Sequence, residues 1–176
     1  KDNPELYVDL STIAKGYGVD RVAHLLDQLR IKQYLVEIGG EVIAKGGKPD
    51  EALWRLAIEK PVSTERAVQR VVQFKDGALA TSGDYRNYYE EDGKRYSHII
   101  DPVTGAPVQH NLVSTSVYAE DTMSADAYAT ALFVMGTEKA KSFAKKHNMA
   151  VMLIYKTDDG FEEYMSEAFK PLLAEQ

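Results

Sequence analysis

Short turns that contain glycine divide most of this chain into brief strand-like segments, and this pattern limits the folds open to it. Turns of this kind join strands that run antiparallel to each other, and Asp-Gly is among the strongest such signals. They occur at Gly39-Gly40, Lys75-Asp76-Gly77, Glu91-Asp92-Gly93 and Asp158-Asp159-Gly160. The strands predicted around and between these turns are Gln33–Ile38, Glu41–Lys45, Trp54–Ile58, Ala67–Phe74, Ala78–Thr81, Tyr85–Glu90, Lys94–Ile100, Leu112–Ala119, Val151–Tyr155 and Phe161–Met165, with a further strand-like run at Leu6–Val8.

Helical spacing of apolar residues is found in three other places. Ser11 and Thr12 are candidate N-caps of a helix that runs to about Leu29. Two more helices are predicted at Met123–Met135 and Glu138–Lys146, and a short helix near the C-terminus. Many antiparallel hairpins with three main helices indicate an α+β fold, mostly antiparallel sheet, and 176 residues fit one domain.

The charge balance restricts the kind of partner. The net charge is −6, whereas nucleic-acid binding needs a basic stripe, so we expect no nucleic-acid partner. An acidic protein can still hold an anion where a metal ion or a helix N-terminus supplies positive charge. The chain has no cysteine and no apolar run near the roughly 18 residues of a membrane-spanning helix. It opens on Lys1, from which we expect a piece of a longer precursor.

The segment Asp9–Tyr17 places an acid, two hydroxyls and Lys15 around the start of the first helix. Free N–H groups at a helix start attract anions such as phosphate. The alternative is an ordinary helix cap with a solvated lysine. Gly16 and Gly18 each cost about 1 kcal/mol inside a helix, which suggests that something packs closely against this turn.

Asp126 and Thr130 are four residues apart on the predicted helix Met123–Met135, and therefore share one helical face. The rest of that helix is small or apolar, so a buried carboxylate and hydroxyl need a partner there. Mg²⁺ takes oxygen ligands of these types and often lies against substrate phosphates. An internal hydrogen bond is the alternative explanation.

Two loops complete the candidates. Gly39-Gly40 permits close approach of the backbone to a ligand, or equally a simple bulge. In Ser97–Pro107 two prolines and Gly105 make a stiff loop beside His98, which becomes a candidate general base or hydrogen-bond donor. The alternatives are a well-made hairpin end and a structural histidine.

Five motifs occur in order, and together they resemble the FAD:protein FMN transferase family, also called ApbE. They are Asp9–Tyr17, Glu37–Gly40, Thr81–Arg86, Ser97–Gly105 and Ala125–Ala131. The resemblance covers nearly the whole chain and corresponds to the C-terminal portion of the family's usual length. It implies that residues 1–176 form a single domain of ApbE-like architecture, related to the T-fold, without the family's N-terminal portion.

The resemblance also implies a chemistry. Such enzymes split FAD with Mg²⁺, move FMN to a threonine or serine hydroxyl of an acceptor protein and release AMP. By family position the Mg²⁺ ligands are Thr12 through its backbone carbonyl, Asp126 and Thr130. The positions of Asp9, Lys15 and Ile100 correspond to FAD contacts, and Gly39 and Gly40 are counted with them as cofactor-binding residues. His98 corresponds to the catalytic histidine. Ala129 departs from members that carry an acid there.

Three alternatives to transfer remain: plain hydrolysis of FAD to FMN and AMP, a FAD-binding module without turnover and, ranked last, a scaffold domain in a membrane redox assembly. The resemblance further implies an acceptor flavoprotein subunit of a membrane redox complex, and a periplasmic or cell-envelope location. The sequence indicates neither the identity of the acceptor nor the oligomeric state.

Overall fold

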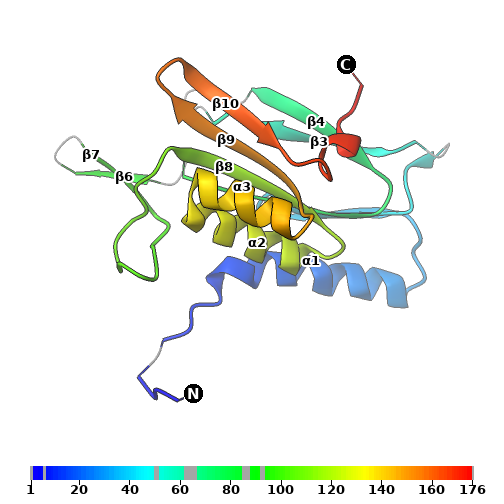
Figure 1. Cartoon of the computed structure of the whole chain (residues 1–176). Helices are drawn as coiled ribbons and strands as arrows, with labels where there is room; N and C mark the ends of the chain where they lie inside the picture. The colour runs from blue at the N-terminus through cyan, green and yellow to red at the C-terminus, as the bar shows by residue number, and fades with distance from the viewer. Residues whose placement is uncertain are drawn as a thin grey trace.

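A six-stranded antiparallel sheet, in the strand order β1-β2-β5-β8-β9-β10, lies at the centre of the fold (Figure 1). The computed structural model describes residues 2–5, 7–49, 52–61, 67–84, 88–91 and 94–175. The strands of this sheet are β1 (Tyr34–Ile38), β2 (Glu41–Lys45), β5 (Gly77–Gly83), β8 (Leu112–Ala119), β9 (Ala150–Thr157) and β10 (Gly160–Met165). Two further pairs are β3 (Trp54–Glu59) with β4 (Val68–Phe74), and β6 (Tyr88–Glu91) with β7 (Lys94–Ser97).

The turn between β1 and β2 shows why glycine is needed at the hairpin ends. Ile38 pairs with Glu41, so Gly39 and Gly40 are the two residues of the turn. Their φ angles are +62° and +103°, a region that side-chain-bearing residues seldom adopt. The turn therefore sets the register of β1 on β2, and the predicted interruption at Gly39-Gly40 is confirmed.

The three helices are α1 (Ser11–Gln28), α2 (Thr122–Met135) and α3 (Thr137–Lys146), and they lie on one face of the central sheet (Figure 1). Ala80, Val117 and Leu153 of the sheet pack there against Leu132 and Phe133 of α2. Alternation along each strand sends the intervening side chains to the other face.

The opposite face of the sheet is covered by β3, β4 and the C-terminal segment. Leu79, Met152 and Ile154 contact Val72 of β4 and the buried Phe169 in a second apolar cluster. The central sheet is therefore buried on both faces, and the helical face is the one that carries the candidate residues of α1 and α2.

Most predicted elements are confirmed, and the differences have local causes. Tyr7 and Val8 form no strand, because neither pairs with a described strand, and both are exposed. β7 ends at Ser97 rather than Ile100, since the chain bends at His98. The C-terminal helix is only the 3₁₀-helix η2 (Lys170–Leu172). The predicted Asp92-Gly93 turn lies outside the described residues.

The start of α1 also differs from the prediction. The N-cap is Leu10, and neither Ser11 nor Thr12 caps the helix with its side chain. Instead the carboxylate of Asp9 accepts a hydrogen bond of 2.8 Å from the Ser11 N–H. Asp9 thus satisfies one of the free donors that the predicted caps were expected to serve.

The close approach of α1 to α2 predicts opposite effects for its two glycines. A Cβ at Gly16 would lie 2.4 Å from the Thr122 carbonyl oxygen, whereas one at Gly18 would meet only the tip of the Ile38 side chain, at 3.3 Å. Gly16→Ala should destabilise the fold by about 1–3 kcal/mol through overpacking. Gly18→Ala should be neutral, or stabilising by up to about 1 kcal/mol, through its higher helix propensity. Urea unfolding of both variants measures this, and equal effects would contradict the crossing as described.

Candidate functional site

The candidate site is built at the crossing of α1 and α2. The Gly16 N–H of α1 donates a hydrogen bond of 2.9 Å to Oδ2 of Asp126 on α2. In return Asp20 of α1 accepts from the backbone N–H groups of Thr122 (2.9 Å) and Met123 (2.8 Å). A carboxylate at a helix N-terminus is favourable because it satisfies free N–H groups and the helix dipole. Each helix therefore holds the other through a carboxylate.

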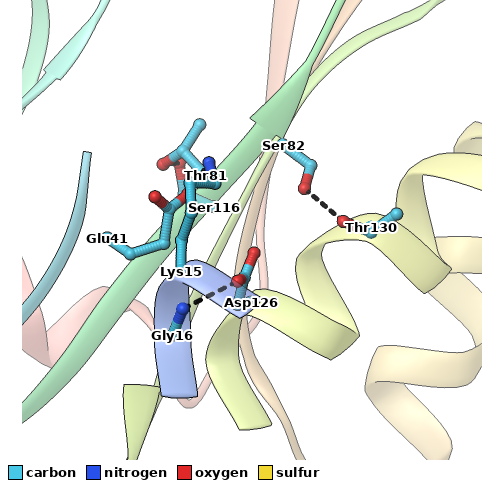
Figure 2. Close-up of polar contacts among 8 residues, drawn as sticks. All are labelled: Lys15, Gly16, Glu41, Thr81, Ser82, Ser116, Asp126 and Thr130. Carbon is cyan, nitrogen blue, oxygen red and sulfur yellow. Dashed lines mark hydrogen bonds and ion pairs between the residues drawn. The ribbon is translucent and has the colours of Figure 1, made fainter. Parts of the chain in front are cut away.

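Asp126 is an almost completely buried carboxylate, with 3% of its surface exposed. Burial raises its pKa, and the hydrogen bond from Gly16 and the positive charge of Lys15 oppose that rise. Within the described residues, Gly16 is the one hydrogen-bond partner of this carboxylate, and it contacts Oδ2. Figure 2 shows Asp126 facing the first turns of α1. Oδ1 therefore remains available as a ligand.

Thr130 lies one turn further along α2, and its hydroxyl meets the Ser82 hydroxyl of β5 at 2.8 Å (Figure 2). The internal hydrogen bond that the sequence left open as an alternative therefore exists for Thr130. A hydroxyl has one donor and two acceptor positions, so this bond leaves Thr130 free to offer a further lone pair. Asp126 and Thr130 thus present oxygen atoms on one face of α2, as their spacing predicts.

Thr12 contributes its backbone to the same region. In a regular α-helix its carbonyl oxygen accepts from the N–H of Gly16, four residues on. That N–H here donates to Asp126. Because one proton cannot serve two acceptors at full strength, the Thr12 carbonyl retains capacity for another partner. Carboxylate, hydroxyl and carbonyl oxygens are the donor set that Mg²⁺ prefers, so these residues fit the ion.

Lys15 and Glu41 form an ion pair on the same side of the sheet. Lys15 Nζ lies 2.7 Å from Glu41 Oε1, and a Cβ placed on Gly39 would lie 3.3 Å from Lys15 Cδ. The β1–β2 turn therefore lies against the lysine side chain. Burial raises the pKa of Glu41, against the opposing effect of Lys15, while the nearby Asp126 raises it further.

The other predicted residues lie outside these contacts. Asp9 is exposed before α1, and the hydrogen bond from the Ser11 N–H lowers its pKa. A Cβ added to Gly40 would meet no atom within 4 Å. His98 and Ile100 are exposed beyond β7. The described contacts join Lys15, Gly39, Asp126 and Thr130 into one neighbourhood and leave these four at its margin.

The loop that carries His98 is closed by its own hydrogen bonds. The Val108 N–H donates to the Ile99 carbonyl (3.0 Å) and the Asp101 N–H to the Ala106 carbonyl (2.9 Å). Gly105 has a φ of +67°, as its predicted role in the turn requires. The loop is therefore a hydrogen-bonded turn, as expected, and its stiffness stays a prediction.

Sequence reasoning did not identify Glu41 or Ser82. Glu41 follows the two-glycine turn as the first residue of β2, and its acid lies among the apolar residues of a strand that is buried in the structure. Alternation places Glu41 on the strand face of Ile43 and Lys45, which the sequence pattern assigns to the exterior, so no local signal indicated that this carboxylate is buried. Ser82 carries no local signal either, because its partner Thr130 lies 48 residues away.

Two further features of the described residues bear on the site. They contain no group of three or more histidine, aspartate or glutamate side chains placed to hold a metal ion, so a cation here would depend on backbone and hydroxyl oxygens as well. A hollow of about 580 Å³ lies elsewhere, lined by β3, β4, β10 and the C-terminal segment, and none of the candidate residues lines it.

Comparison with known proteins agrees with the motifs. The family model described as ApbE family matches residues 1–153. This chain belongs to the ApbE family. It is 55% identical over 174 residues to the FAD:protein FMN transferase of Vibrio cholerae, covering 99% of this chain and 52% of that protein. It is 48% identical over 176 residues to the FAD:protein FMN transferase of Escherichia coli K12, covering 100% of this chain and 50% of that protein.

Solved ApbE structures share the fold. The flavin transferase ApbE from Vibrio cholerae superimposes with a TM-score of 0.87 at 54% identity, over 98% of this chain and 55% of that one. The ApbE protein from Thermotoga maritima gives 0.84 at 35% identity, over 96% and 54% of the two chains. These matches bear out the α+β fold. The chain spans about half the length of the relatives it matches. No helix in the described part of the chain is long and apolar enough to cross a membrane.

Because the pKa of Asp126 is raised, its ionisation is predicted to lower the stability of the fold as the pH rises. Its folded pKa lies above the ordinary value, so the stability that Asp126 contributes is greatest at low pH and is lost as pH rises through the folded pKa. In EDTA at neutral pH, Asp126→Asn should therefore unfold at a higher temperature than the wild type, by about 2–4 °C for each kcal/mol gained. Asn keeps an oxygen for the Gly16 N–H. Thermal unfolding between pH 4 and 8 measures the difference, which should shrink as the pH falls; a difference independent of pH would contradict the assignment.

Proposed function

We propose that this chain carries the FAD-splitting centre of a FAD:protein FMN transferase, and that it corresponds to the C-terminal half of such enzymes. The observation that carries the proposal is the buried Asp126, held by the Gly16 N–H one turn away from the Thr130 hydroxyl. The printed function of the relatives from Vibrio cholerae and Escherichia coli supports it.

In this proposal Asp126, Thr130 and the Thr12 carbonyl hold Mg²⁺. The ion would neutralise the charge of the diphosphate, which an acidic chain cannot bind unaided. Lys15 provides a second positive charge, and its side chain is 48% exposed although the ammonium is paired to Glu41. The Gly39-Gly40 turn would let the protein backbone approach the substrate closely beside this lysine. Asp9 and Ile100 are further FAD contacts in this proposal.

The transfer step follows from the substrate's bonds. The oxygen of an acceptor threonine or serine hydroxyl forms a bond to the phosphorus of the FMN half. The P–O bond of the anhydride breaks, and AMP leaves with the bonding electron pair. His98 takes the proton of the attacking hydroxyl. An exposed position on a hydrogen-bonded loop suits this role, since the acceptor is a protein and must reach the imidazole from outside.

The partner and the location follow as parts of the same proposal. The acceptor is a flavoprotein subunit of a membrane redox complex, and the enzyme acts in the periplasm or at the cell envelope. The family relationship supports both statements.

Metal-dependent release of AMP from FAD tests the proposal directly. We expect AMP with Mg²⁺ and none with EDTA, measured by chromatography, and at least a hundredfold loss in Asp126→Asn because the amide is a poor ligand for a hard cation. Asp121→Asn is the matched control on α2: its carboxylate caps Ser124 N–H, and Asn caps a helix equally well. AMP release that survives in Asp126→Asn would overturn the metal assignment.

A second experiment separates transfer from hydrolysis. His98→Asn should lose FMN transfer to a threonine-containing acceptor peptide by at least tenfold, measured as the mass gained by the peptide, because the hydroxyl loses its base. Binding of FAD should be retained. His24→Asn on the exposed side of α1 is the control. AMP without any gain in peptide mass in the wild type would favour FAD hydrolysis, and binding of FAD without AMP would favour a binding module.

A further inference from the structure

Glu41 is a buried carboxylate to which the proposed reaction assigns no part. It is the first residue of β2 and has 1% of its surface exposed. Its Oε1 accepts from Lys15 Nζ at 2.7 Å. Its Oε2 is also buried, and has no hydrogen-bond partner among the described residues. The arrangement therefore leaves one charged oxygen uncompensated in the interior.

Such an arrangement is a poor way to stabilise a fold. Removing a carboxylate from water costs several kcal/mol, and a single ion pair to a half-exposed lysine offsets only part of it. An apolar residue of similar size at this strand position would be as stable or more so. The effect of Glu41 must be sought in what it does to Lys15.

Lys15 is held at two points of its side chain, Cδ and Nζ. It projects from the first turns of α1, and its Cδ lies against Gly39, where an added Cβ would be only 3.3 Å away. A lysine side chain has about 2 kcal/mol of rotamer entropy when free, which binding of a phosphate would otherwise have to overcome. The Glu41 carboxylate fixes the ammonium before any ligand arrives, while 48% of the lysine side chain stays accessible.

The charge of the fixed ammonium reaches the Asp126 carboxylate, whose pKa burial raises and this charge lowers. Lys15 and its neighbour Gly16 come from α1, Glu41 from β2 and Asp126 from α2; Figure 2 shows the Lys15 side chain running alongside Glu41, and Asp126 directed to the Gly16 N–H. Asp126 and Glu41 are close enough for each to feel the Lys15 charge. A lysine between two carboxylates would bend toward either one, so the tight contact to Glu41 sets its direction.

We propose that Glu41 is a positioning residue, which holds the Lys15 ammonium beside Asp126 in the orientation that receives a substrate diphosphate. This inference rests on the proposed function for the identity of that substrate, FAD. It names a residue whose effect is transmitted through Lys15 and not through contact with FAD.

A double-mutant cycle on the whole chain tests this role. The variants are Glu41→Gln, which keeps the shape and an acceptor oxygen but removes the charge, Lys15→Met, and the two combined. Asp27→Asn is the matched control, because Asp27 and Lys45 form another 2.7 Å ion pair between α1 and β2, at a solvent-exposed position. Affinity in Mg²⁺ is measured for FAD by flavin fluorescence and for inorganic pyrophosphate by calorimetry, with thermal unfolding of each variant.

We expect Glu41→Gln to lower the affinity for both ligands about tenfold, which is the size of effect expected for loss of a hydrogen bond to a charged group. In the Lys15→Met background the same change should have less than a twofold effect, because the residue it positions is gone. Lys15→Met alone should lower the unfolding temperature by leaving Glu41 unpaired, and the added Glu41→Gln should restore it. Asp27→Asn should leave both affinities within twofold of the wild type.

Three results would overturn the proposal: an unchanged affinity in Glu41→Gln, effects of the two changes that add in full, or an equal loss in Asp27→Asn. Metal-dependent AMP release with an unchanged Glu41→Gln affinity would reject this inference and leave the proposed function standing. Pyrophosphate binding that depends on both residues, without AMP from FAD, would support the positioning role and reject the function. A wild-type chain that binds neither ligand would overturn both.

Discussion

The contact of α1 with α2 at Gly16 is the constraint on which the candidate site depends. Only a residue without a Cβ lets the Thr122 carbonyl approach this closely. The short distance brings the Gly16 N–H to Asp126, 110 residues further along the chain, and brings Asp20 to the N-terminus of α2. The first turn of one helix and the polar face of the other consequently border the same space. Without that approach Thr12 of α1 would be unrelated to Asp126 and Thr130 of α2.

The electrostatics of the site follow from the same packing. Burial raises the pKa values of two carboxyl groups, Asp126 and Glu41. The charge of Lys15, which is paired with Glu41, opposes the rise at both. This arrangement costs stability in the protein without a cation, which is typical of sites where function and stability compete. In the proposed function, the Mg²⁺ that Asp126 would help to hold supplies, together with Lys15, the positive charge that a chain of net charge −6 needs to bind a diphosphate.

Sequence reasoning was most successful where the cause is local. The glycine turns at Gly39-Gly40 and Asp158-Asp159-Gly160, the three helices and most strands depend on backbone preferences over a few residues, and the structure confirms them. The turn at Lys75-Asp76-Gly77 instead joins strands of two different sheets. It was wrong at Ser11 and Thr12, since Asp9 serves the Ser11 N–H instead, and at Leu6–Val8, where Tyr7 and Val8 have no strand to pair with. The roles of His98 and Ile100 stay predictions.

The sequence by itself determined most of the elements, the common face of Asp126 and Thr130 and the family motifs. Each of these follows from residues that are neighbours along the chain or one helical turn apart. Only the tertiary structure decided that Lys15 meets Glu41, that Gly16 meets Asp126 and that Thr130 meets Ser82, across 26, 110 and 48 residues respectively. Such partners are set by strand order and helix packing. These minimise the apolar surface exposed to water over the whole domain, and no local stretch of sequence signals them.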